Sequence, residues 1–447
     1  MMIFTVRAWF RTLAAVVSAM VMVAGCGTAQ AQTAKELELE ARIQRLEKML
    51  SELTGKPVPA LETAAAPPPS PAPGPALQAQ SITPNAQPGT RFLFTGFFKL
   101  DAIASKYRDG EIADGSIGRD FYLPSTIPVG GADEDADLDA HVKSSRFIFG
   151  TESSAPDGSP ISSRLEVDLF GSALGDERVT NTYGVLLRQA YVQYKHWLVG
   201  QSWSNFQDVA ALPETADFIG PTDGTVFVRQ PQVRYTNGNF SLSAENPETT
   251  ITPFGGGTRI SSDDNDVPDL TATYTYKLPA GYLRASLLAR QLKLETTGMT
   301  AIDDSTVAAA LSVSGKINFG ANDLRFMVTG GDGIGRYVGV NFANDAELTA
   351  SGELRAVSGW AAFAAWRQAW NSQLRSTVMV SASEYDNNIG LAGGSANKSS
   401  LSLAVNTFYT LAPKLDIGLE LRYAQREIES GDDGSLQRLQ AIAKYSF

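Results

Sequence analysis

Arginine side chains recur at every second position of short segments whose remaining positions are apolar. In residues 415–426 (LDIGLELRYAQR) the odd positions from 415 to 423 are Leu, Ile, Leu, Leu and Tyr, whereas the even positions include Asp416, Glu420, Arg422 and Arg426. A guanidinium keeps its charge at physiological pH and binds a carboxylate through two parallel hydrogen bonds. Rows of such groups on one face of a strand predict attraction of anions rather than covalent chemistry.

The same alternation, applied to each extended segment, predicts which charged side chains share the arginine-bearing face. The predicted arginines are Arg146, Arg164, Arg234, Arg284, Arg290, Arg325, Arg367, Arg375, Arg422, Arg426 and Arg438. The lysines of this face are Lys99, Lys277, Lys316 and Lys444, and its acids are fewer: Asp101, Glu166, Asp168, Glu245, Asp416 and Glu420. Many arginines could simply pair with these acids and brace the structure. The basic surplus predicts an interior that concentrates anions and repels cations.

The residues needed for catalysis or for a cofactor are scarce in this chain. It has two histidines, His141 and His196, which fall far apart in the expected topology, so we assemble no Ser/His/acid arrangement and predict no enzyme, cofactor or metal site. Acidic runs at 133–139 and 263–266 could hold calcium or bridge lipopolysaccharide through divalent ions, or they could simply be solvated. The formal charge of −11 argues against nucleic acid as a partner, and we predict none.

The elements that carry these residues are predicted to be strands of a membrane barrel. From residue 91 onward, apolar and polar residues alternate, and very short connections alternate with long loops rich in Gly, Asp and Asn. This is the pattern of an antiparallel up-and-down transmembrane β-barrel with its apolar face toward lipid. We predict about sixteen strands, because counting residues 345–357 as a wall strand would give an odd number. A soluble β-sandwich would show the same alternation, but the export signal, the long strands and the strand-terminal Phe447 favour the barrel.

One segment is too apolar for an exposed loop and too interrupted by proline and glycine for a strand. It is residues 207–228 (QDVAALPETADFIGPTDGTVFV). We predict that it folds into the lumen and narrows the pore, with Asp208, Glu214, Asp217 and Asp223 facing arginines of the opposite wall. The alternatives are an external loop packed at the mouth or a contact between subunits.

The N-terminal part divides into three segments ahead of the barrel at 91–447. Residues 1–31 have the basic start, apolar run and small-residue cleavage site of a secretory signal, although Cys26 also fits a lipoprotein cleavage box. Residues 55–90 form a Pro/Ala-rich linker. Between them, residues 32–54 are predicted to form a short coiled coil, or alternatively a surface helix, whose seam is Leu39, Ile43, Leu46, Leu50 and Leu53.

Several long segments of the barrel resemble the DcaP-like family of porins. They are residues 118–130 (GRDFYLPSTIPVG), 145–151 (SRFIFGT), 198–209 (LVGQSWSNFQDV), 211–224 (ALPETADFIGPTDG), 228–236 (VRQPQVRYT) and 246–249 (NPET). The resemblance implies a sixteen-stranded, trimeric channel of the bacterial outer membrane for small organic anions such as dicarboxylates, with the coiled coil in the periplasm. Expected partners are therefore membrane lipid and lipopolysaccharide, two further copies of the chain, and the barrel assembly machinery, which would read Phe447. The rival function is a closed barrel that tethers the envelope.

Overall fold

The computed structural model describes residues 89–173, 183–298 and 301–447. The predicted signal peptide, Cys26, the coiled-coil seam and almost all of the predicted linker lie outside the described residues. None of the helices in the described ranges is long and apolar enough to cross a membrane.

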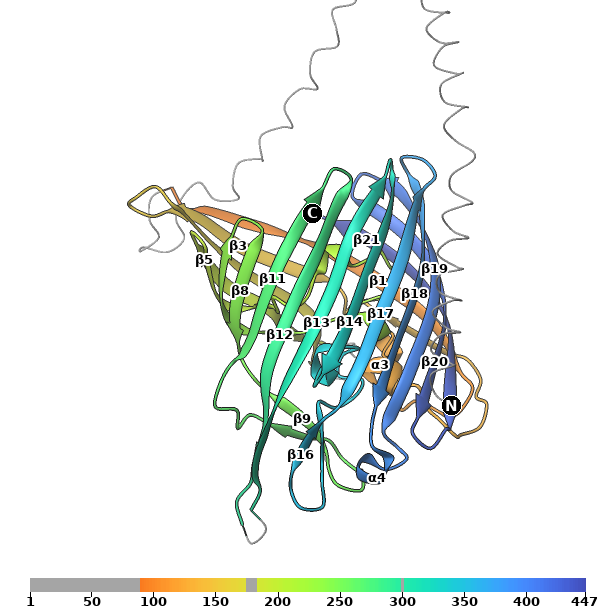
Figure 1. The fold of residues 1–447 in the computed structure, drawn as a ribbon. Helices are drawn as coiled ribbons and strands as arrows, with labels where there is room; N and C mark the ends of the chain where they lie inside the picture. Colours follow the sequence, from red (N-terminus) through yellow and green to blue (C-terminus); the bar gives the residue numbers. More distant parts are fainter. Residues whose placement is uncertain (1–88, 174–182, 299–300) are drawn as a thin grey trace, which may run out of the picture. The chain divides into compact units, whose positions relative to one another are not determined.

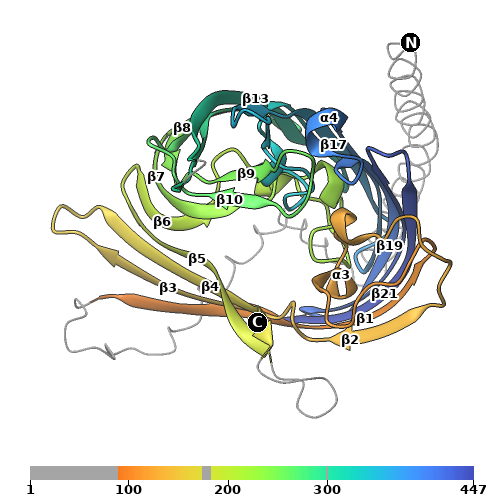
Figure 2. The ribbon, with the colours of Figure 1, turned by 90° about the horizontal axis from the view of Figure 1, so that it is seen from below.

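The described part is an antiparallel β-barrel with sixteen wall positions (Figures 1 and 2). Consecutive strands pair with each other around the wall, and one position is shared by two strands, β2 and β3, which both pair with β1. The wall strands are β1 (Arg91–Tyr107), β2 (Asp137–His141), β3 (Arg146–Ser154), β4 (Pro160–Ala173), β5 (Tyr183–Tyr194), β6 (Trp197–Trp203), β7 (Arg229–Asn237), β8 (Phe240–Glu245), β11 (Asp269–Leu278), β12 (Gly281–Glu295), β13 (Asp303–Phe319), β14 (Asn322–Asp332), β17 (Ser358–Ala369), β18 (Leu374–Asp386), β19 (Asn397–Ala412), β20 (Leu415–Ile428) and β21 (Asp433–Ser446).

The barrel closes where β1 pairs with β21 along most of the length of both strands. At the end of this seam the Phe447 N–H donates to the Gly96 carbonyl at 3.0 Å. The Phe447 ring lies 5.3 Å from the ring of Phe94 and 5.4 Å from that of Phe98. The seam therefore ends in an aromatic cluster at the rim that carries the tight turns.

The two rims differ as the sequence predicts. Tight turns connect strands at the upper rim of Figure 1, and long loops occupy the lower one. At the loop rim a separate four-stranded sheet forms from β9 (Thr249–Thr252), β10 (Ile260–Ser262), β15 (Ala346–Leu348) and β16 (Leu354–Ala356). Because β15 and β16 belong to this sheet and not to the wall, the prediction that residues 345–357 lie in a loop is confirmed.

The wall has the two-sided character that alternation predicts. On β20 the side chain of Leu419 points outward and is 49% exposed, whereas Arg422 points inward and is 4% exposed. Outward positions on the neighbouring strands are also large and apolar, as a lipid-facing surface requires. The sixteen-stranded all-β barrel is thus confirmed.

The main hydrophobic core of the described residues lies inside the barrel, between the wall and two loops. Phe206 and Val226 of one loop pack with Tyr337 and Phe342 of another and with Phe363 of the wall. The 3₁₀ turns η2 (Val209–Ala211) and η3 (Thr222–Gly224) lie in the first of these loops, and η4 (Gly335–Tyr337) lies in the second. The β1–β2 loop contains the short helix α3 (Ile117–Asp120) and the 3₁₀ turn η1 (Pro124–Thr126), and the β18–β19 loop contains the short helix α4 (Ile389–Ala392). The interior is therefore partly filled, and loop positions decide which wall residues water can reach.

Candidate functional site

The loop from Ser204 to Val228 lies inside the barrel and follows the inner wall. Its Ala216 carbonyl accepts a hydrogen bond from Lys99 Nζ on β1 at 2.6 Å, and its Ala216 N–H donates to Glu420 Oε2 on β20 at 2.9 Å. Further along, the Gly224 N–H donates to Ser381 Oγ on β18 at 2.7 Å. A Cβ at Gly224 would lie 2.1 Å from the Ala362 carbonyl oxygen, so glycine is required for this close approach. We refer to residues 204–228 as the inner loop.

Three of the four inner-loop carboxylates form no ion pair with an arginine in the described residues, contrary to the sequence-based expectation, although the charge of Asp208 acts on Arg284 and that of Asp217 on Arg422. Asp208 accepts hydrogen bonds from Tyr282 and Ser314, and Asp223 accepts from Tyr122 Oη at 2.7 Å and from Ser402. Within the described ranges none of them, nor Asp217, forms an ion pair.

Asp217 is occupied by backbone donors. Its carboxylate accepts from the N–H groups of Tyr122 at 2.9 Å and Gly220 at 3.1 Å. All three aspartates are buried where the inner loop packs against the wall. Since a buried polar group needs a hydrogen-bond partner, their carboxylates are matched by donors of the protein. Only Glu214 follows the prediction in part, since it pairs with Arg375 at 2.7 Å and lies 3.6 Å from Arg367.

Three of the predicted arginines point inward but are buried, so in this structure they do not line an open path. Arg290 pairs with Asp345 at 2.8 Å and with Asp269 at 3.5 Å. Arg422 pairs with Glu420 at 2.8 Å. Arg438 donates to the Gly118 carbonyl and to Ser105. These guanidiniums hold the loops to the wall, which is the bracing alternative for these positions.

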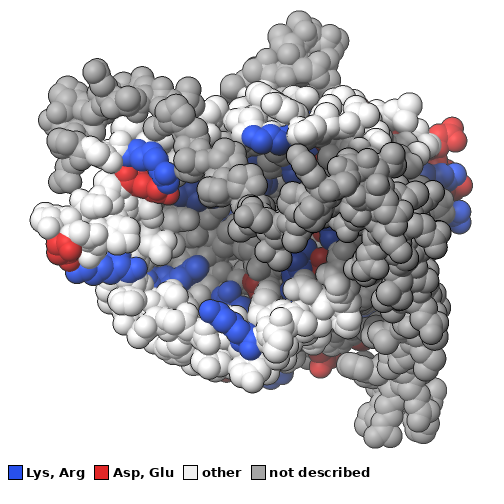
Figure 3. All heavy atoms as spheres, turned by 90° about the horizontal axis from the view of Figure 1, so that it is seen from above, with Lys and Arg blue, Asp and Glu red and all other residues white. Residues whose placement is uncertain are grey.

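The other predicted arginines keep part of their side chains accessible on the inner face. They are Arg146, Arg164, Arg234, Arg284, Arg325, Arg367, Arg375 and Arg426. Figure 3, which looks in from the rim with the tight turns, shows Lys and Arg atoms around the opening and deeper on the wall of the hollow.

Most carboxylates of the inner face are covered, in contrast to these arginines. Arg164 is 36% exposed at its side chain, while its partner Glu166, 2.7 Å away, is 2% exposed. Asp101, Asp168 and Glu245 are equally buried. Apart from Glu214 and Asp416, which remain partly accessible, the predicted inner-face acids are covered, so the charge that a solute would meet there is predominantly basic.

Sequence reasoning missed two inward arginines, Arg188, which is buried, and Arg229, which is partly accessible. Arg188 on β5 contacts Glu166 at 2.9 Å and Asp168 at 2.6 Å, and its guanidinium lies 5.1 Å from the Phe218 ring of the inner loop. The pairing of β4 with β5 skips Arg188, which is the mark of a β-bulge. A bulge lets two consecutive side chains point inward, so strict alternation misplaces Arg188. The second, Arg229, lies where the inner loop rejoins the wall as β7.

The acidic loop runs pair with cations of the chain itself. Arg119 contacts Asp139 at 3.1 Å and Asp137 at 3.4 Å, and Lys293 contacts Asp266 at 3.0 Å. In the part of the chain that the structure describes, no group of His, Cys, Asp or Glu side chains converges as metal ligands would.

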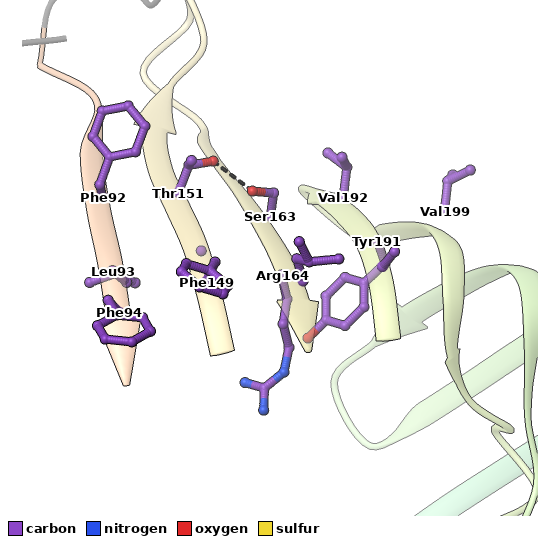
Figure 4. Close-up of a pocket in the computed structure, with 13 residues that line it drawn as sticks. Phe92, Leu93, Phe94, Phe149, Thr151, Ser163, Arg164, Tyr191, Val192 and Val199 are labelled. Atoms are coloured by element: carbon purple, nitrogen blue, oxygen red, sulfur yellow. Dashed lines mark hydrogen bonds between the residues drawn. The ribbon is translucent and has the colours of Figure 1, made fainter. Parts of the chain in front are cut away.

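A hollow of about 680 Å³ lies on the outer wall rather than in the lumen (Figure 4). It spans β1 and β3 to β6 and is lined mainly by Phe92, Phe94, Phe149, Val192 and Val199, whereas Arg164 extends away from this apolar group. Beside it, β6 leaves the wall at Trp203 to become the inner loop, so within the described residues no strand pairs with positions 184–189 of β5 on that edge. We refer to residues 184–189 as the open edge.

Comparisons with known proteins agree with this geometry. A family model described as DcaP outer membrane protein matches residues 137–447. The crystal structure of the outer membrane channel DcaP of Acinetobacter baumannii superposes with a TM-score of 0.66 at 24% identity, covering 81% of this chain and 99% of that one. An anion-selective porin from Comamonas acidovorans gives a TM-score of 0.48 at 11% identity, covering 80% and 100%. No curated protein sequence matches.

Proposed function

Since the chain belongs to the DcaP outer membrane protein family and has a porin fold, we propose that it forms a water-filled, anion-preferring channel for small organic anions of the dicarboxylate kind. The observation that carries this proposal is the unequal burial of charge on the inner face. The side chains of Arg146, Arg164 and Arg367 are 22%, 36% and 27% exposed, whereas the carboxylates of Glu166, Asp168 and Asp323 are covered. Fixed cations along a narrow aqueous path raise the local anion concentration and oppose cations.

The preference is tested by reversal potentials of single channels in a salt gradient. Arg164→Gln and Arg367→Gln should each lower the anion-to-cation permeability ratio, and the double variant should lower it several-fold. Arg91→Gln is the matched control, because Arg91 lies at the rim with the tight turns and pairs there with Glu152. An unchanged ratio in the double variant contradicts the assignment of these arginines to the solute path.

A closed barrel with a structural role is the competing function, and the loop-filled interior is the observation that favours it. Planar bilayers separate the two functions. Stepwise currents that scale with salt support the channel, whereas absence of current from correctly folded protein supports the closed barrel.

The proposal includes assembly into a homotrimer. The open edge carries Val185, Leu186 and Leu187, three consecutive exposed apolar side chains, beside the outer-wall hollow. Backbone groups without partners are costly in hydrocarbon, so a wall edge of this kind needs a cover. A second copy of the chain would supply apolar side chains and pack into the hollow.

The N-terminal parts belong to the same proposal. Residues 1–31 would direct export, and residues 32–54 would associate as a coiled coil in the periplasm, joined by the linker at 55–90 to the barrel at 91–447. Phe447, which lies outward in its aromatic cluster, would serve as the signal for the barrel assembly machinery. Lipid and lipopolysaccharide would surround the outer wall.

A further inference from the structure

A second hollow lies at the loop rim, away from the inner loop. It has a volume of about 170 Å³ and is bordered by the β9–β10 loop, the residues after η4, the segment around α4 and the end of β20. Figure 2 shows β9, β10 and α4 at this end of the barrel. Its lining includes Arg259, Asn344, Asn387, Ser395 and Arg426. We refer to it as the mouth pocket.

The loops around the mouth pocket are fixed to one another by hydrogen bonds. The Gly255 N–H donates to the Leu391 carbonyl at 2.7 Å, and Asn397 Nδ2 donates to the Phe342 carbonyl. A Cβ at Gly256 would lie 2.7 Å from the Ala392 carbonyl oxygen, so these two loops approach closely. The pocket is therefore preformed, which reduces the ordering cost of binding a ligand.

Two guanidiniums enter this pocket, and each is held by neutral acceptors. Arg259 donates to the Asn344 side-chain oxygen at 2.5 Å and to the Asn341 carbonyl at 2.8 Å. Among the residues that the structure describes, it has no carboxylate within ion-pair distance.

Arg426 is held in the same way from the wall. It donates to the Asn397 side-chain oxygen at 2.8 Å and to the Ile127 carbonyl at 2.7 Å, and within the described ranges it also lacks an ion-pair partner. The nearby acids are engaged elsewhere, since Glu427 pairs with Lys398 at 2.6 Å and Glu429 accepts from Asn387. The mouth pocket thus carries two positive charges that form no ion pair with a described carboxylate, although the charge of Asp345, which pairs with Arg290, acts on Arg259.

We propose that the mouth pocket is a binding site for a small organic dianion, with one carboxylate on Arg259 and the other on Arg426. A cavity of about 150 Å³ holds benzene, so the available volume suits a short dicarboxylate. Each guanidinium retains a terminal nitrogen for a charge-assisted hydrogen bond, which is stronger than a neutral one. If the barrel is the anion channel proposed above, the pocket captures solute at the entrance before it reaches Arg367 and Arg375.

The experiment is calorimetric titration of succinate into the purified full-length protein in detergent. Arg259→Gln and Arg426→Gln should each weaken binding at least tenfold, because each removes a charged partner of one carboxylate. Arg355→Gln is the matched control. Arg355 is an exposed arginine of the same loop sheet that does not line the pocket, so this variant should bind within twofold of wild type. Arg426→Lys, which keeps the charge, should recover part of the affinity and shows that the barrel still folds.

The outcomes separate this site from the channel proposal. Wild-type affinity in both Arg259→Gln and Arg426→Gln, together with loss of binding in Arg375→Gln, overturns the mouth pocket and leaves the channel intact. Arginine-dependent succinate binding in a protein that shows no anion preference in bilayers supports the pocket and contradicts the channel. Equal affinity for acetate and succinate overturns the two-carboxylate arrangement, because a monoanion can engage only one arginine.

Discussion

Glu166 shows how one buried carboxylate organises two partly accessible cations, Arg146 and Arg164, and a buried one, Arg188. It lies 3.4 Å from Arg146, 2.7 Å from Arg164 and 2.9 Å from Arg188, and its own side chain is covered. Its charge holds the guanidiniums in place and partly cancels their field. The field that a passing solute meets therefore depends less on the number of arginines than on how deeply the carboxylates that pair with them are buried.

Glu166→Gln should raise anion preference while weakening the barrel. The substitution keeps the shape of the side chain but leaves the surrounding arginines with less neutralising charge. Removing one partner of a buried ion pair costs on the order of 3 kcal/mol. We expect a higher anion-to-cation permeability ratio in bilayers and a lower unfolding temperature by circular dichroism. A lower ratio would contradict the field assigned to this cluster.

Glu347 is a second residue whose burial has a measurable consequence, this time at the mouth. Burial raises the pKa of Glu347 to about 7, and the charges of Glu429 and Asp386 act in the same direction. Its carboxyl also accepts a hydrogen bond from the Asn388 N–H at 2.8 Å. The carboxyl of Glu347 binds its proton more tightly in the folded state than in the unfolded state. The protonated carboxyl therefore contributes stability that is fully present below pH 4.5 and is lost as the pH rises through about 7.

The loop sheet should therefore loosen between pH 5 and pH 8. Hydrogen exchange of residues 346–356 and 387–392 should show less protection at pH 8, with a free-energy difference of at most about 3 kcal/mol. Glu347→Gln should remove this pH dependence and keep the acidic-pH protection at both values. Equal protection of the wild-type loops at pH 5 and pH 8 would rule out the buried carboxyl as the cause.

At the scale of elements, one tyrosine of the β1–β2 loop contacts the inner loop at two of its aspartates. The Tyr122 hydroxyl donates to Asp223 at 2.7 Å, and its N–H donates to Asp217 at 2.9 Å. Its ring also lies 4.6 Å from the guanidinium of Arg422. The β1–β2 loop, the inner loop and β20 thus meet at Tyr122.

Tyr122→Phe should loosen the inner loop by about 1–3 kcal/mol, because the buried Asp223 carboxylate loses a donor. Single-channel recordings should show more open-channel noise or additional conductance levels. Tyr385→Phe is the matched control, since the Tyr385 hydroxyl is buried without a hydrogen-bond partner in the described structure. If both variants behave like wild type, Tyr122 does not restrain the inner loop.

Sequence reasoning predicted the strands and the two faces of the wall, but it did not predict which residues the inward side chains contact. Alternation of apolar and charged residues in β20 fixed both faces correctly, since hydrocarbon outside and polar surroundings inside leave little freedom. It placed Arg422 inward but could not show that Tyr122 and the loops cover it. It missed Arg188 because a bulge between β4 and β5 interrupts the alternation. Sequence reasoning also placed Asp217 and Asp223 opposite arginines of the far wall, although donors from two loops and from β19, which no local pattern reveals, engage them.

At the scale of the whole molecule, the open edge should decide the oligomeric state. Leu187→Asn places a polar group at this edge and should shift the detergent-solubilised protein from trimer to monomer, as measured by light scattering after size-exclusion chromatography. Leu287→Asn is the matched control, because Leu287 is an equally apolar, outward residue of β12, far from β5 in the strand order. A trimer that survives Leu187→Asn, or a wild-type monomer, would contradict the proposed interface.

The seam between β1 and β21 has a consequence for how the molecule is made. Residues that pair there, such as Ser105 and Arg438, are 333 positions apart in the chain. Contacts of such long range form late, because the intervening segment must be ordered before its ends can meet. Until then both edge strands of the growing sheet have unpaired backbone groups, so we expect biogenesis to require a partner protein that covers these edges until the barrel closes.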